Sequence, residues 1–173
     1  MEPVVEFIEY PDYEAYRAFF YFVNMRRPMA WVSWFMYYAL FPVALLLFAL
    51  AAFLTEIPTS LWLLAPIWLA GMLANATAPR RSFRRGKKFI AERTAFFEDY
   101  YANLTTCENS SHESSYRYDD VAMVYETATA FYLKKNTANQ WGFFPKKFFA
   151  PGQVEALRAL FARKFGERFK TKI

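Results

Sequence analysis

The sequence predicts an α+β membrane protein, in which a two-helix transmembrane hairpin precedes a small antiparallel β-domain with a C-terminal helix. Residues 28–55 and 57–79 contain no Asp, Glu, Lys or Arg, and uncharged runs of this length are typical of membrane spans. The chain then changes to short segments rich in Phe, Tyr, Thr and Val between turn formers, which indicates strands. The uneven placement of a 55% hydrophobic content excludes an intrinsically disordered chain and an ordinary soluble domain.

The expected hairpin occupies residues 28–79, with spans at Trp31–Leu54 and Pro58–Ala78. Helices over these spans would be about 36 Å and about 31 Å long, enough for a hydrocarbon core of about 30 Å. Basic residues flank only the outer ends of the hairpin, at Arg26-Arg27 and in residues 80–88. The positive-inside rule therefore predicts that both termini are cytoplasmic.

Residues 1–27 are expected to form a cytoplasmic strand and an amphipathic helix. Val4–Glu9 alternates in the manner of a strand, and Pro11 suits the first turn of a helix. A lone strand is unstable, so we expect Val4–Glu9 to pair with the sheet edge of residues 94–144. The alternative is a free acidic tail, because the first 14 residues hold five acids and no base.

Residues 80–173 are predicted to hold a juxtamembrane basic segment and the β-domain. About six strands are expected, at Thr94–Glu98, Tyr100–Thr106, Tyr116–Tyr118, Met123–Thr127, Ala130–Lys134 and Gln140–Phe144. Apolar residues then recur at helical spacing from Val154 to Phe165, which predicts a C-terminal helix that stops at Gly166. Such a helix covers an open face of a small sheet.

Short motifs in this region resemble the YcxB-like family. They are Tyr118-Asp119-Asp120-Val121, Val124 with Glu126-Thr127, Phe131-Tyr132-Leu133, and Pro145-Lys146-x-x-Phe149 before the helix. Members of that family are small bacterial membrane proteins with two spans and a cytoplasmic domain of pleckstrin-homology-like (PH-like) type. The resemblance implies a PH-like β-domain and a multi-pass protein of the bacterial cytoplasmic (inner) membrane. It also implies structural roles for Tyr118, Asp120, Val121, Glu126, Phe131, Pro145, Lys146 and Phe149.

The residue types that carry catalysis or bind metals are too few and too scattered to predict an enzyme. A lone Cys107 and a lone His112 cannot make a tetrahedral zinc site. His112 lies in the polar run Asn109–Ser115, which is expected to be a solvated loop. Asp119 and Asp120 are adjacent, so on a strand they would point to opposite faces, and we interpret them as a turn. We therefore predict no catalytic residue, no metal and no cofactor.

Two basic clusters and one small-residue face are candidate contact surfaces. The first cluster is expected to set topology or to contact anionic lipid, and comprises Arg80, Arg81, Arg84, Arg85, Lys87 and Lys88. The second is expected to form a solvated face or to contact headgroups, and comprises Lys146, Lys147, Arg158, Arg163, Lys164, Arg168, Lys170 and Lys172. The four-residue spacing of Ala70, Ala74 and Ala78 suits packing on the first span or on a second copy. No groove-reading pattern predicts nucleic-acid binding.

These features predict a non-catalytic, membrane-anchored binding or regulatory protein that presents its PH-like domain at the cytoplasmic membrane face. The expected partners are the lipid bilayer, anionic lipid, and a protein partner or second copy through the alanine face. Two alternatives stay open. One is an immunity or resistance protein that intercepts a toxin at the membrane, and the other is an enzyme without a recognised catalytic constellation.

Overall fold

The structure, a computed structural model, describes residues 2–26, 30–54, 64–86, 89–137 and 140–171. The chain divides into two units. Residues 1–12 and 87–173 form the first, which we call the β-domain, and residues 13–86 form the second, which we call the helical unit.

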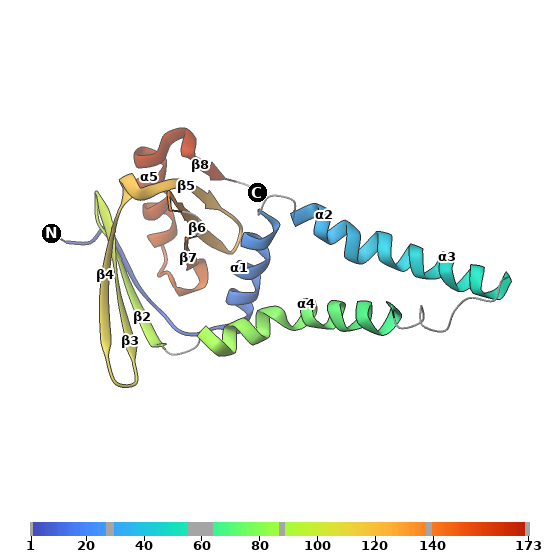
Figure 1. Ribbon diagram of the computed structural model, residues 1–173. Helices are drawn as coiled ribbons and strands as arrows, with labels where there is room; N and C mark the ends of the chain where they lie inside the picture. The colour runs from blue at the N-terminus through green and yellow to red at the C-terminus, as the bar shows by residue number, and fades with distance from the viewer. Residues whose placement is uncertain (1, 27–29, 55–63, 87–88, 138–139, 172–173) are drawn as a thin grey trace. The chain divides into compact units, whose positions relative to one another are not determined.

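The first sheet of the β-domain has the strand order β1-β2-β3-β4, and each neighbouring pair is antiparallel. Its strands are β1 (Val5–Glu9), β2 (Phe89–Phe96), β3 (Tyr100–Cys107) and β4 (Ser111–Arg117). Figure 1 shows β4 beside β3 as the outermost strand of this sheet. The sheet therefore ends at β4.

β1 confirms the predicted pairing of the N-terminal residues with the C-terminal part of the chain. It lies antiparallel beside β2, with Val5 opposite Phe96. Val5 and Phe7 are buried in the core, and the Phe7 ring lies 4.3 Å from the Phe149 ring between centroids. The β-domain is thus built from both ends of the chain, and the alternative of a free acidic tail is excluded.

β4 corrects the expected loop around His112. The run Asn109–Ser115 was expected to be solvated loop, but β4 begins at Ser111 and pairs with β3 without a register shift. The low strand propensity of Ser and Glu is overridden because β3 supplies a complete ladder of backbone partners. The side chain of His112 is exposed, as expected.

The second sheet has the strand order β7-β6-β5-β8. Its elements are η3 (Tyr118–Asp120), β5 (Val121–Glu126), β6 (Ala130–Lys135), β7 (Trp141–Pro145), η4 (Lys146–Phe148), η5 (Gly166–Arg168) and β8 (Phe169–Thr171). β5, β6 and β7 confirm three of the expected strands and are antiparallel, whereas β8 runs parallel to β5. β8 was not predicted, because three residues are too few to show an alternating pattern.

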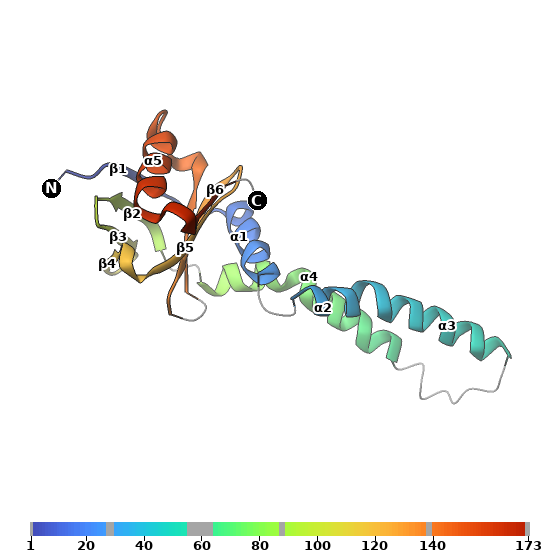
Figure 2. The ribbon, with the colours of Figure 1, turned by 90° about the horizontal axis from the view of Figure 1, so that it is seen from above.

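Helix α5 (Gln153–Phe165) confirms the predicted C-terminal helix and lies between the two sheets (Figure 2). Its buried face consists of Leu157, Leu160, Phe161 and Phe165. The Phe161 ring lies 5.7 Å from Phe96 of β2 and 5.6 Å from Phe131 of β6 between centroids. Gly166 follows the helix with a φ of 51°, a conformation that glycine adopts without a steric penalty.

The helical unit contains α1 (Tyr13–Met25), α2 (Ala30–Phe35), the π-helical segment η1 (Met36–Leu40), α3 (Phe41–Leu54) and α4 (Leu64–Gly86). Aromatic rings join its helices. Phe83 of α4 lies 5.6 Å from Tyr13 and 5.4 Å from Tyr16 of α1 between centroids. The rings of Phe41 and Trp68 stack with a centroid distance of 6.5 Å and an interplanar angle of 2°, and this contact links α3 to α4.

The structure contradicts the predicted transmembrane hairpin. Over the described residues, no helix has both the length and the apolar character needed to cross a membrane. The first expected span is divided among α2, η1 and α3, and α3 by itself is only about 21 Å long. α4 is longer, but four arginines occupy its C-terminal part. The expected connector Thr55–Ser60 lies outside the described residues.

The predicted fold class is therefore corrected. The chain was expected to be an α+β membrane protein with a two-helix transmembrane hairpin and a small antiparallel PH-like β-domain capped by a C-terminal helix. The structure is an α+β fold with two four-stranded sheets, one of which includes the parallel pair β5–β8. The predicted multi-pass location in the bacterial inner membrane is also contradicted, because it depended on the two spans. The placement of both termini in the cytoplasm was derived from the same spans and loses its basis with them.

Candidate functional site

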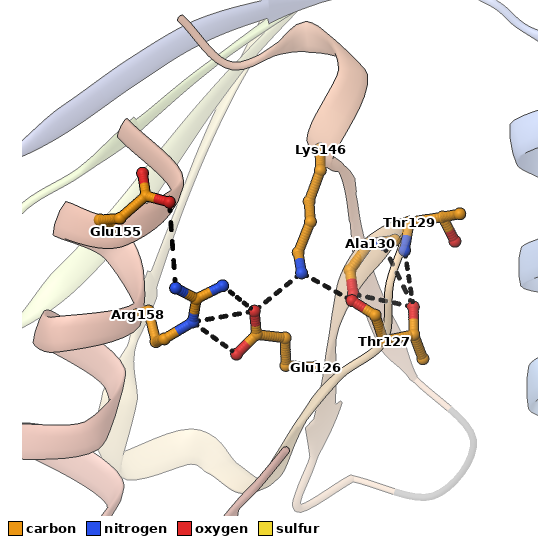
Figure 3. A network of polar contacts seen from close by, with 7 residues as sticks. All are labelled: Glu126, Thr127, Thr129, Ala130, Lys146, Glu155 and Arg158. Carbon is orange, nitrogen blue, oxygen red and sulfur yellow. Dashed lines mark hydrogen bonds and ion pairs between the residues drawn. The ribbon is translucent and has the colours of Figure 1, made fainter. Parts of the chain in front are cut away.

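Three charged side chains of the β-domain, Glu126, Lys146 and Arg158, form what we call the Glu126 cluster (Figure 3). The Glu126 side chain is 7% exposed, and those of Lys146 and Arg158 are 16% and 43% exposed. Lys146 Nζ donates to Glu126 Oε1 at 2.7 Å, and Arg158 Nη2 donates to the same oxygen at 2.6 Å. Arg158 Nε donates to both carboxylate oxygens at 3.0 Å. Both oxygens of Glu126 are therefore bonded to cations.

Three elements bring these side chains together. Glu126 is the last residue of β5, Lys146 begins η4 directly after β7, and Arg158 lies in α5. Lys146 Nζ also donates to Thr127 O at 2.6 Å, and the Lys146 backbone N–H donates to Thr129 O at 2.8 Å. The cluster therefore ties η4 and α5 to the turn between β5 and β6.

The surroundings of Glu126 hold its pKa below the ordinary value. Burial is the largest single influence and raises the pKa, but the hydrogen bonds from Arg158 and Lys146 and the attraction of both cations together lower it by more. The hydrogen bond to Glu126 in turn raises the pKa of Arg158. An ionised carboxylate whose oxygens are already bonded is unsuited to general acid–base catalysis. The cluster is a structural link between β5, η4 and α5.

Other residues of the family motif lie in the core of the β-domain. Val121 and Phe131 are fully buried. Lys146 Nζ lies over the Phe131 ring at 5.0 Å from its centroid, so the cluster also rests on this core ring. Tyr118 is buried, and its hydroxyl group donates a hydrogen bond to Phe97 O at 2.8 Å. These contacts give Val121, Phe131 and Tyr118 roles in folding.

The remaining motif residues shape turns. Asp119 and Asp120 lie in η3, which confirms that they form a turn at the start of β5. Asn136 fixes this turn, because its side-chain amide donates to Asp119 O at 3.0 Å and its backbone N–H donates to Asp120 O at 2.8 Å. Pro145 ends β7, and Phe149 follows η4 and packs against the core cluster.

Most members of the second basic cluster make defined contacts within the β-domain. The contacts beyond the Glu126 cluster are Lys147 with Asp12, Arg163 with Glu98, Lys164 with Asp99, and Arg168 with the carbonyl of Val121. Exposed ion pairs of this kind contribute about 0–1 kcal/mol each. Lys172 lies outside the described residues. The sequence could not distinguish these paired bases from a solvated face.

The first basic cluster lies at the C-terminal end of α4. Its described members Arg80, Arg81, Arg84 and Arg85 are all exposed, and we call them the α4 arginine face. Lys87 and Lys88 lie outside the described residues. α4 contains no Asp or Glu. Ala70 and Ala74 are exposed on the same helix and Ala78 is half-buried, so packing of a second copy on them stays a prediction.

The chemistry-bearing residues of β3 and β4 do not converge on one point. His112 of β4 lies opposite Thr105 of β3. Cys107 is the last residue of β3 and is a half-buried free thiol. Within the part of the chain that the structure describes, no group of three or more His, Cys, Asp or Glu side chains is placed to hold a metal ion.

Sequence reasoning missed a pair of facing carboxylates on β1 and β2. Glu9 lies directly opposite Glu92. Burial, with added repulsion from Glu92, raises the pKa of Glu9 to about 8. Burial also raises the pKa of Glu92, partly offset by a hydrogen bond from Asn103 at 2.6 Å. The signal was present in the alternation of β1, because Glu9 follows Val5 and Phe7 on the inward face of the strand.

Replacing Glu9 with Gln is expected to flatten the dependence of stability on pH. The folded-state pKa of about 8 lies above the ordinary value of 4.5, so this group contributes stability that is complete below pH 4.5 and is lost as the pH rises to about 8. A neutral amide avoids that loss. Glu9→Gln should raise the free energy of unfolding by roughly 1–3 kcal/mol above pH 8 and leave it unchanged near pH 4.5.

Urea unfolding across a pH series measures this effect, with the exposed Glu167→Gln as the control. The control should keep the slope of the wild-type profile. A wild-type slope in Glu9→Gln would show that Glu9 titrates normally in the folded chain.

Part of the chain matches a known protein family. The family model described as YcxB-like protein matches residues 96–161, which run from the end of β2 into α5 and include the whole Glu126 cluster. No curated protein and no solved structure matches the chain. The resemblance predicted from the motifs is thereby confirmed: residues 96–161 of this chain match the model of the YcxB-like family.

Proposed function

We propose that this protein is a non-catalytic binding protein that engages an anionic partner through the α4 arginine face. The observation that carries the proposal is the concentration of four exposed guanidinium groups on a helix without a single carboxylate. Helical spacing places Arg80, Arg84, Arg81 and Arg85 within an arc of about 140°, so their charges act on the same side of α4.

The charges of the β-domain support a scaffold role for that unit. Its motif carboxylate is neutralised by Lys146 and Arg158, and the exposed Arg163 and the half-buried Lys164 are paired with acids. Such a unit has little uncompensated charge at these positions, whereas the α4 arginine face keeps its charge. Guanidinium groups match phosphate and carboxylate oxygens in pairs of parallel hydrogen bonds. Anionic lipid headgroups, the partner expected from the sequence, are therefore the first probe.

Binding of the full-length chain to vesicles tests the proposal. Vesicles of phosphatidylcholine are compared with vesicles that also contain phosphatidylglycerol, and the bound fraction is measured by co-sedimentation. The wild type is expected to prefer the anionic vesicles. Changing all four residues of the α4 arginine face to Gln should weaken this binding at least about tenfold, since each base near an anionic surface contributes on the order of 1 kcal/mol before screening by salt.

A matched control separates the arginine face from net charge. The control variant changes four exposed bases on other elements to Gln: Arg17, Lys134, Arg163 and Lys170. Both variants lose the same charge, so the control should keep most of the binding. Equal loss in both variants, or equal binding of the wild type to neutral and anionic vesicles, would refute the proposal.

A further inference from the structure

The free edge of β4 is a complete and unprotected strand edge. β4 is seven residues long, and its ladder with β3 runs from Ser111 opposite Thr106 to Arg117 opposite Tyr100 without a bulge. Proteins usually block such edges with proline, lysine, a bulge or a covering segment, because an open edge pairs with other strands. The sequence of β4 contains neither proline nor lysine.

The hydrogen bonds at the two ends of the β3–β4 ladder show which backbone groups point to the free edge. Cys107 N donates to Ser110 O at 2.8 Å, and Tyr118 N donates to Asp99 O at 3.1 Å. Bonded pairs alternate along an antiparallel ladder. The backbone groups that face away from β3 are therefore those of Ser111, Glu113, Ser115 and Arg117. Arg117 is the N-cap of η3, so its carbonyl accepts the first hydrogen bond of that helix. For the other groups, no backbone bond to another element is found in the described parts of the chain.

The charges along this edge are complementary to themselves. When two β4 strands run antiparallel about a two-fold axis at Ser115, the Ser115 backbones of the two copies face each other as a bonded pair. Glu113 of each copy then lies directly opposite Arg117 of the other. A two-fold axis at Glu113 would instead place the two Glu113 side chains against each other. Opposite charges on facing strands stabilise and like charges destabilise by about 0.2–1 kcal/mol per pair.

The groups involved are available for this contact. Glu113 and Ser115 are exposed, and Arg117 makes a 3.4 Å ion pair with Asp119 in which both side chains are largely exposed. An exposed pair of that length contributes little, so Arg117 can exchange Asp119 for Glu113 of a second copy at small cost.

We propose that two copies of this chain associate through antiparallel pairing of their β4 strands, in the register that places Glu113 opposite Arg117. The first sheets of the two copies then form one continuous sheet across the two-fold axis, with a bonded pair at Ser115 and, at each Glu113–Arg117 position, a hydrogen bond from the Arg117 backbone N–H to the Glu113 carbonyl. This surface lies in the β-domain, so it is independent of the α4 arginine face and of the proposed anionic partner.

A charge-reversal cycle tests both the surface and the register. Sedimentation equilibrium of the full-length chain should show a monomer–dimer equilibrium for the wild type. Glu113→Arg and Arg117→Glu should each weaken the dimer about tenfold, because each change places two like-charged pairs across the axis. The double variant Glu113→Arg/Arg117→Glu restores opposite charges and should return the dissociation constant to within about threefold of the wild type. Melting of each variant checks that the fold is kept.

Cross-linking tests the position of the axis in a second way. In a Cys107→Ser background, Ser115→Cys places two cysteines on facing backbones about 5.5 Å apart, within disulfide range. It should give a cross-linked dimer on mild oxidation, whereas Ser111→Cys on the same exposed edge should not. A monomeric wild type overturns the proposal. So does a dimer that is unaffected by the charge variants, or one in which the double variant is no tighter than the single variants.

Discussion

The β-domain is expected to lose most of its stability when residues 1–9 are deleted. This deletion removes β1 with its whole ladder to β2, together with the buried side chains of Val5 and Phe7. Loss of a buried Phe side chain alone costs about 3–5 kcal/mol, and small domains are stable by only about 5–15 kcal/mol. The truncated chain should therefore melt far below the wild type, and the segment 89–171 should become sensitive to limited proteolysis.

Two further variants show whether β1 itself is responsible. Deletion of residues 1–3 removes the chain before the strand and should leave melting and protease resistance unchanged. Phe7→Ala keeps the strand and should lower the free energy of unfolding by about 3–5 kcal/mol. If the chain without residues 1–9 resists protease and melts as the wild type does, β1 is not part of the domain.

Replacement of Glu126 by Gln is expected to lower the free energy of unfolding by about 2–4 kcal/mol. The amide keeps the shape of the side chain but leaves Lys146, whose side chain is only 16% exposed, without a counter-charge, and it removes the closer of the two acids at Arg158. A largely buried charge that loses its partner destabilises the fold. Chemical unfolding of both proteins at neutral pH measures the difference. The control is Glu155→Gln. Glu155 meets Arg158 at 4.0 Å from an exposed position, so its loss should change stability by less than about 0.5 kcal/mol.

The pH dependence of the same variant gives an independent check. The folded-state pKa of Glu126 is lowered, so its contribution is present above the ordinary value of 4.5 and is lost as the pH falls through the folded-state pKa. The wild type should therefore lose more stability than Glu126→Gln on acidification below about pH 4.5. Equal stability of Glu126→Gln and the wild type at neutral pH would show that the cluster does not hold η4 and α5 in place.

Alternation and helical periodicity predicted those parts of the β-domain where side chains face a core. Ala130–Lys134, the face of α5 around Phe161, and the N-terminal strand were all recognised because apolar residues repeat with the period of the element. The lone-strand argument also predicted that Val4–Glu9 pairs with the sheet edge of residues 94–144, although it did not say with which strand. These elements show their burial pattern within a few consecutive residues, so the sequence contains the signal locally.

Other features depend on contacts that no local pattern contains. β4 is polar along most of its length and forms a strand because β3 supplies backbone partners. Glu126 is held by Lys146 and Arg158, which lie 20 and 32 residues away in the chain. Because of this separation, no local sequence pattern predicts that the two bases pair with Glu126, although both were assigned to a basic cluster.

The error over the helical unit has a different origin. The spans were predicted from the number of consecutive uncharged residues. That number gives the length of an apolar segment, but it does not show whether one regular α-helix runs through the whole segment. In Trp31–Leu54 the helix passes from α2 through the π-helical segment Met36–Leu40 to α3, and no charge marks that change. In α4 the apolar part gives way to arginines within one helix. These arginines are evident in the sequence, but we interpreted them as residues that flank a membrane span and not as part of the same helix.

Native-state hydrogen exchange of the full-length chain tests most directly the central claim that both chain ends form one β-domain. The amides of Val5–Glu9 that bond to β2 should exchange with the same free energy of opening as those of Phe89–Phe96, because the two strands open as one cooperative unit. Exchange of residues 5–9 at the rate of a free peptide, while β2 stays protected, would contradict the account.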